Sequence, residues 1–69
     1  MRQLKEFRAR ENLTQYQLAK KLDISPSYYI KVEQGIAKPG RGFIEKFIRA
    51  FPGESTDMFF GGDKNDSHN

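Results

Sequence analysis

Two helix starts, a tight turn and a helix stop are packed into residues 14–35. Thr14 carries a side-chain oxygen suited to cap a helix. Ser25 followed by Pro26 predicts a second start, because the hydroxyl accepts an unpaired backbone N–H and proline is preset for the first helical position. Gly35 supplies the left-handed residue that commonly ends a helix. Only two residues separate the two helices, expected at about 14–22 and 25–34, so they must cross steeply instead of lying antiparallel.

Apolar periodicity places three more helices around this pair. Leu4 and Phe7 indicate a first amphipathic helix, which Asn12 ends because asparagine tolerates left-handed geometry. From Phe43 to Phe51, apolar residues recur at i, i+1, i+4, i+5 and i+8, a wide face that needs another surface to cover it. The sequence therefore predicts an all-α fold, a small five-helix bundle, with helices at about 2–11, 14–22, 25–34, 41–51 and 55–60.

Size and composition favour one small domain at residues 1–60. The chain has 69 residues and no cysteine, so its stability must come from packing, to which nine aromatic side chains can contribute. Residues 61–69 have nothing to bury, and we expect them to form a disordered tail. No apolar run approaches the roughly 18 residues that span a membrane, and the start has no apolar leader segment. We therefore expect a cytoplasmic protein with no membrane contact.

The charge is unevenly distributed along the chain. Residues 1–53 hold eleven Lys and Arg against five Asp and Glu, a balance of +6, whereas residues 54–69 hold one lysine against four acids, a balance of −3. The folded part is thus more basic than the net charge of +3 implies. Such an excess suits a polyanion, since neutralising phosphates and releasing counterions dominates the affinity of proteins for DNA.

Taken together, these residues resemble the phage repressor/Cro-type (Xre-type) helix-turn-helix domain. The resemblance covers about residues 2–60 and is specific as a combination, although each piece of it is common. It implies a repressor-like bundle that binds double-stranded DNA as a prokaryotic or phage transcriptional regulator. The matching residues are Leu4, Phe7, Arg8, Leu13, Thr14, Gln15, Leu18, Ala19, Ile24, Ser25, Tyr28, Lys31, Val32, Glu33, Gly35, Pro39, Ala50 and Phe51.

Helical geometry sorts the third helix into an inner and an outer side. At about 100° per residue, placing Tyr29 and Val32 inward leaves Ser27, Ile30, Lys31 and Gln34 outward. Recognition helices read bases mainly with their N-terminal part. A lysine at the outer side can donate to guanine O6 and N7, whereas a proline offers apolar contact only. The residues predicted to contact bases are Ser25, Pro26, Ser27, Tyr28 and Lys31, with partial core packing as the alternative for Tyr28 and solvation for Lys31.

Phosphate contacts are expected around this helix. At the start of the second helix, the side chain of Gln15 and the free N–H groups could bind one phosphate oxygen together, as a glutamine does in the resembling family. Lys38 and Arg41 flank the glycines of the following loop, where the backbone can approach DNA closely. Arg10 is a weaker prediction, and simple solvation is the alternative for each basic residue.

The resemblance also implies that Arg8 pairs with Glu33. Related repressors join these positions by an Arg–carboxylate bridge, so we expect a two-pronged, partly buried ion pair that holds the first helix against the third. Breaking one side of a buried pair can cost about 3–5 kcal/mol, because the other charge is stranded. Two unrelated surface charges are the alternative.

Proteins of this type usually dimerise, so that two recognition helices meet half-sites about 34 Å apart. The apolar group near the C-terminus exceeds what so small a core needs, and we expect it to form the homodimer surface, with closure of the core as the alternative. This group comprises Phe51, Met58, Phe59 and Phe60.

An enzyme is a poor interpretation of this sequence. The single histidine, His68, falls in the expected tail, and no carboxylate pair or glycine loop is placed for catalysis. We expect no catalytic residue, cofactor, metal or small-molecule ligand. The alternative function is a protein-interaction module with the same fold, such as an antitoxin or phage adaptor, which would grip a protein with the Tyr28–Ile30 region.

Overall fold

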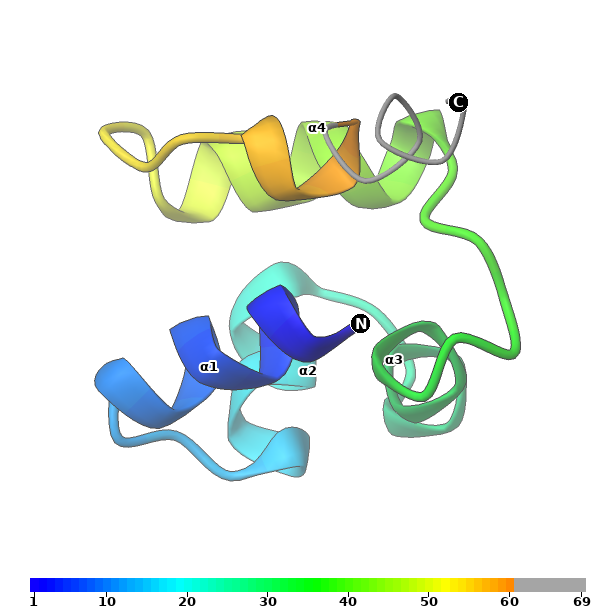
Figure 1. The fold of residues 1–69 in the computed structure, drawn as a ribbon. Helices are drawn as coiled ribbons and strands as arrows, with labels where there is room; N and C mark the ends of the chain where they lie inside the picture. Colours follow the sequence, from blue (N-terminus) through cyan, green and yellow to red (C-terminus); the bar gives the residue numbers. More distant parts are fainter. Residues whose placement is uncertain (61–69) are drawn as a thin grey trace.

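The computed structural model describes residues 1–60, and the expectation of a disordered tail at 61–69 lies outside them. The described part is all-α. Four α-helices and one short 3-10 helix follow each other along the chain (Figure 1). Their bounds are α1 Arg2–Arg10, α2 Gln15–Leu22, α3 Pro26–Glu33, α4 Arg41–Ala50 and η1 Asp57–Phe59.

The helix predicted at 55–60 was therefore too long. Only three residues adopt 3-10 geometry there, and the Ser55 hydroxyl accepts the backbone N–H of Asp57 at 3.1 Å just before them. The fourth helix also ends one residue early. Phe51 leaves the helical region at φ −132° and ψ 70°, because the proline that follows it disfavours the α conformation.

Side-chain caps and left-handed residues set the boundaries of the predicted helix pair. The Thr14 hydroxyl accepts the N–H of Gln17, whose side chain in turn accepts the N–H of Thr14, so that α2 begins with a reciprocal capping box. Ser25 caps α3 by accepting the N–H of Tyr28 at 3.2 Å. Gly35 has φ +83°, as expected for a helix stop.

Two further left-handed residues shape the turns. Asn12 has φ +58°, as predicted, and it lies in the link between α1 and α2. Asp23 has φ +60° between α2 and α3, a position for which the sequence analysis made no prediction. A left-handed Asp is tolerated because its short polar side chain can hydrogen-bond to the backbone nearby. This single residue reverses the chain quickly enough for α3 to start at Pro26.

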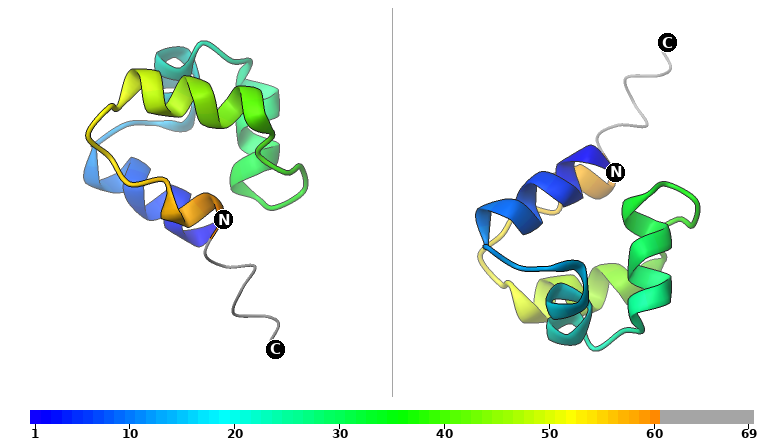
Figure 2. Two further views of the ribbon diagram at one scale, coloured as in Figure 1. Left: turned by 90° about the horizontal axis from the view of Figure 1, so that it is seen from above. Right: turned by 90° about the horizontal axis from the view of Figure 1, so that it is seen from below.

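The helices enclose one core with α3 placed at its edge. In Figure 1, α3 is seen end-on while α4 lies in the plane of the picture, and Figure 2 shows the same crosswise arrangement from above and below. The η1 turn returns to lie beside the start of α1 (Figure 2). The buried core residues are Leu4, Phe7, Leu18, Ala19, Leu22, Tyr29, Val32, Phe43 and Phe47.

The C-terminal apolar residues mostly close the base of this core. The Phe51 ring packs edge-on against Phe7 with centroids 4.9 Å apart, and the Phe59 ring does the same against Phe47 at 5.1 Å. Met58 is partly buried against the same cluster, whereas Phe60 is 54% exposed. The structure thus packs three of the four residues of the expected dimer surface, partly buried, against the core of their own chain.

Candidate nucleic-acid interface

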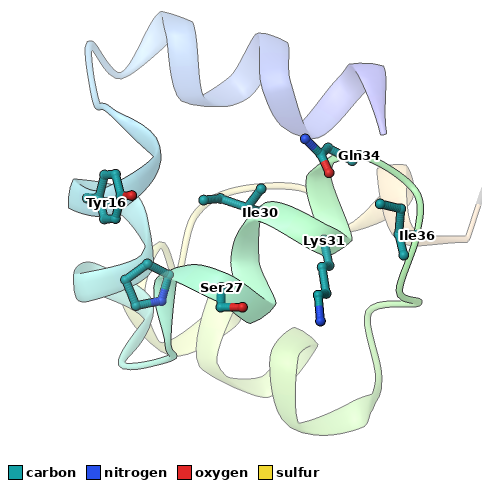
Figure 3. A pocket seen from close by; sticks show the side chains of 7 residues that line it. Tyr16, Ser27, Ile30, Lys31, Gln34 and Ile36 are labelled. Carbon is teal, nitrogen blue, oxygen red and sulfur yellow. The ribbon is translucent and has the colours of Figure 1, made fainter.

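Within residues 1–60, no other element covers the outer side of α3. Ser27, Lys31 and Gln34 are exposed, and Ile30 is half-buried at the edge of the core. This is the side that the helical geometry predicts. The outer side borders an open hollow of about 590 Å³, to which α2 and the segment after α3 also contribute (Figure 3). We call it the α3 hollow, and its lining residues are Tyr16, Pro26, Ser27, Ile30, Lys31, Gln34 and Ile36.

The five residues predicted to contact bases divide between two sides of α3. Pro26, Ser27 and Lys31 line the α3 hollow. Ser25 and Tyr28 instead line a second depression, which faces the start of α4. The hydroxyl of Ser25 already accepts a backbone hydrogen bond as the helix cap. The structure therefore brings three of the five together at the outer face of the helix.

Tyr28 ties down the loop that follows the helix. Its hydroxyl donates to the main-chain carbonyl of Lys38 at 3.1 Å, and its ring packs edge-on against Phe43 with centroids 6.0 Å apart. The loop also folds back on α3, because the N–H groups of Ile36 and Ala37 both donate to the carbonyl of Lys31. These contacts fix the backbone that presents the exposed Lys38 side chain beside α3.

Four hydrogen bonds converge on the carboxylate of Glu33, which is 7% exposed. Arg8 donates through Nε at 2.7 Å and Nη2 at 3.2 Å, Tyr29 donates its hydroxyl at 2.6 Å, and Gln15 donates Nε2 at 2.8 Å. The α-amino group of Met1 donates to the main-chain carbonyl of the same residue. One buried acid thus joins α1 and the first residue of α2 to α3.

The electrostatics of this network favour a charged carboxylate. Burial raises the pKa of Glu33, but the hydrogen bonds from Arg8, Tyr29 and Gln15, with the charge of Arg8, outweigh it and hold the pKa below its usual value. The hydrogen bond to Glu33 raises the pKa of Arg8. Burial, followed by the hydrogen bond and charge of Glu33, raises the pKa of Tyr29 well above its usual value. Tyr29 therefore remains a hydrogen-bond donor across the neutral range.

Gln15 was expected to bind a phosphate with its side chain, and in the structure it points inward. Its Nε2 atom uses one hydrogen for Glu33. The backbone at the start of α2 retains donors, however. The capping box takes the N–H groups of Thr14 and Gln17, while those of Gln15 and Tyr16 have no partner among the described residues. Two main-chain N–H groups are thus available beside the α3 hollow.

The three basic residues predicted to contact phosphates lie in different parts of the structure. Lys38 is exposed in the loop after α3, and Arg41 is exposed at the first position of α4. Arg10 is distant from them, because it ends α1 on the side of the molecule away from α3 (Figure 1). There it pairs with Glu54 at 3.2 Å and lies 5.5 Å from the centre of the Phe7 ring. The structure gathers two of these three cations near α3.

Two residues of the α3 hollow were not predicted from the sequence. Tyr16 is 65% exposed on α2 and Ile36 is 71% exposed just after the helix stop. The sequence does contain a signal for both, since each is a large apolar residue that no inward-facing helical stripe includes. The capping glutamine Gln17 was missed as well, although a Thr followed three residues later by Gln is its usual signature.

Within residues 1–60, no three His, Cys, Asp or Glu side chains come close enough to hold a metal ion. The same part of the chain contains no helix whose length and apolar character would let it cross a membrane.

The family profile and the relatives that match this chain all carry the helix-turn-helix description. The sequence profile of a family described as helix-turn-helix matches residues 4–58. A protein of Archaeoglobus fulgidus named an uncharacterized HTH-type transcriptional regulator is 45% identical over 47 residues, which make up 68% of this chain and 20% of that relative. A second protein of the same name and organism is 34% identical over 56 residues, 81% of this chain and 79% of the relative. The chain thus spans about a fifth of the first relative and most of the second. No solved structure matched with significance.

Proposed function

Because this chain belongs to the helix-turn-helix family of DNA-binding domains, we propose that it is a non-enzymatic, cytoplasmic transcriptional regulator of prokaryotic or phage type. It binds double-stranded DNA at a specific sequence by placing α3 in the major groove, which is wide enough to admit an α-helix. The observation that carries this proposal is the free outer side of α3, where Lys31 stands with no element of the described chain covering it.

Base reading is assigned to the N-terminal half of α3. Lys31 is the main reader, since its ammonium can donate to guanine O6 and N7, and Ser27 and Pro26 add a hydroxyl and an apolar surface. Ser25 acts through its cap and Tyr28 through the loop that it holds. Both residues therefore position the reading face, and any base contact that they make lies at the edge of that face.

Phosphate contacts flank this face on both sides. The N–H groups of Gln15 and Tyr16, which have no partner within residues 1–60, lie on one side, where a helix N-terminus favours an anion. Lys38 and Arg41 lie on the other side, in and after the loop. The buried Glu33 network holds α1, α2 and α3 in one arrangement. The hydrogen bond from Tyr28 to the carbonyl of Lys38 holds the loop against α3, so Lys38 keeps a fixed separation from the start of α2. Arg10 contributes little, because it is paired elsewhere.

We further propose that two copies bind one symmetric site. A single α3 offers few base contacts, and pairing two of them on half-sites one helical turn apart multiplies affinity and specificity. Of the residues first assigned to the dimer surface, Phe60 is the exposed one that remains for such a contact. Two-fold symmetry of the bound sequence is the expected sign of dimerisation on DNA.

Selection of random DNA duplexes by the purified chain tests this function. The expected result is enrichment of one short sequence, with a steep fall of affinity as salt rises because several phosphates are neutralised. Lys31→Ala should weaken binding and relax the preference at one base pair. Arg49→Ala is the matched control, since it also removes one exposed charge but lies at the end of α4 that points away from α3 (Figure 1). If no sequence is enriched and salt has no effect, the proposed function is refuted.

One observation favours the protein-interaction module as a second candidate. Tyr16 and Ile36 leave large apolar surfaces exposed beside α3, as binding sites for proteins do. An apolar protein contact would change little with salt, whereas binding through phosphates would weaken steeply. The salt titration therefore separates the two candidates.

A further inference from the structure

The α3 hollow differs from a purely polar reading surface. Among the described residues, its lining contains the apolar side chains of Tyr16, Pro26, Ile30 and Ile36, a single cation, Lys31, and no carboxylate. Tyr16 and Ile36 are 65% and 71% exposed, so the fold gains little from them. An outer face of this composition is matched to a partner that is negatively charged overall and presents small apolar groups.

The arrangement places the apolar wall directly beside the cation. Figure 3 shows Ile30 between Tyr16 on α2 and Lys31 on α3, with Ile36 on the far side of Lys31. Ile30 is half-buried, so its position is fixed by the core behind it. A base edge that meets Lys31 therefore has apolar side chains on both sides of it.

In the major groove, the thymine C5-methyl is the apolar group that base-pair edges display. Building on the proposed function, we infer that the α3 hollow recognises thymine methyl groups next to the base pair that Lys31 contacts, with Ile30 at the centre of the methyl-binding wall. The charge of the hollow supports DNA over a protein as its occupant. Lys31 lies within it, the N–H groups of Gln15 and Tyr16 open beside it, and no acid of residues 1–60 lines it.

Uracil provides the probe, because it differs from thymine only by the missing methyl group and pairs with adenine in the same way. Removing one methyl that is buried against an apolar wall should weaken binding about four-fold, the value of one buried methyl-sized group. A thymine outside the hollow should show no change. The effect is thus expected at some thymines of the site and absent at others.

The experiment uses the duplex recovered by selection and replaces each thymine by deoxyuridine in turn. We expect the wild-type chain to lose about four-fold in affinity at one or more thymines adjacent to the base pair at which Lys31→Ala relaxes preference. Ile30→Ser should bind the thymine and uracil duplexes equally. Ile48→Ser is the matched control, because Ile48 is 46% exposed on α4 and should keep the difference.

The possible outcomes separate the recognition of thymine methyl groups from DNA binding itself. If the wild-type chain binds a selected duplex tightly and every uracil replacement is neutral, the inference is overturned and the proposed function stands. If no duplex is bound at all, the proposed function itself fails, and an apolar protein becomes the occupant of the hollow. Because the uracil duplexes are tested with the wild-type chain, the result does not depend on whether Ile30→Ser folds. Ile36→Ser, at a 71% exposed position, gives a second variant with no core contact to lose.

Discussion

Replacing Arg8 by methionine tests whether the Glu33 network holds the helices together. Methionine keeps an unbranched apolar stem in place but removes every donor of the guanidinium. Three hydrogen bonds are lost, two to the Glu33 carboxylate at 2.7 and 3.2 Å and one to the carbonyl of Leu13 at 3.0 Å. Within the described residues, the Glu33 carboxylate is then left buried with no cation hydrogen-bonded to it.

The magnitude follows from what remains around the carboxylate. Breaking a buried ion pair on one side costs about 3–5 kcal/mol. Tyr29 and Gln15 still donate to Glu33, and the Arg8 side chain is 18% exposed, so solvent screens part of the interaction. We therefore expect the lower end of the range, a loss of about 3 kcal/mol in the free energy of unfolding. For a domain of this size, that corresponds to a fall in Tm of about 12–24 °C.

Thermal and urea unfolding followed by circular dichroism at pH 7 measures this loss. Arg10→Met is the control, because Arg10 is 64% exposed and its pair with Glu54 lies on the surface. Its effect should be at most about 1 kcal/mol. A surface ion pair contributes at most about 1 kcal/mol. If the free energies of unfolding of both variants lie within that amount of the wild-type value, the network does not stabilise the fold as argued.

The Arg8–Glu33 ion pair also predicts how the stability of the domain depends on pH. The folded state lowers the pKa of Glu33, so its stabilisation is complete above the unfolded value, near about 4.3, and is lost as the pH falls through the folded value. The difference in stability between the wild type and Arg8→Met should therefore be largest above about pH 5 and shrink toward pH 3. A difference that stays constant over this range would contradict the assignment.

Three further variants probe separate parts of the account. Tyr29→Phe removes the 2.6 Å hydrogen bond to the buried Glu33 carboxylate, and urea unfolding should show a loss of about 2 kcal/mol. Gly35→Ala places a side chain at φ +83° in open space, so backbone strain alone should destabilise the domain by about 1–2 kcal/mol in the same assay. Lys31→Ala should leave stability unchanged and cost about 1–3 kcal/mol in binding to the selected duplex, measured by fluorescence anisotropy against a scrambled duplex.

The fold was largely predictable because its signals are local. Thr14, Ser25 and Gly35 act on their own neighbouring backbone, so their caps and stops could be assigned without knowledge of the tertiary structure. Apolar periodicity then oriented α3 correctly. The last helix was overestimated because its length depends on how much of residues 55–60 can pack against the core, which local sequence does not state.

The candidate site was less predictable because it depends on contacts between distant residues. The pairing of Arg8 with Glu33 came from the resemblance, since 25 positions separate the two. The inward turn of Gln15 and the bond from Tyr28 to Lys38 could not be foreseen, because both depend on partners that tertiary packing brings near. The α3 hollow likewise combines α2, α3 and the segment after it, so no single periodic pattern outlines it.

Mapping DNA contacts by NMR tests the central claim most directly. Spectra of the 15N-labelled chain are compared with and without the selected duplex at low salt. The account predicts that the backbone signals of Tyr16, Ser27 and Lys31 shift strongly, while those of Arg49 and η1 change little. Large shifts confined to η1 and the end of α4, with α3 unaffected, would show that this chain does not read DNA with the helix assigned here.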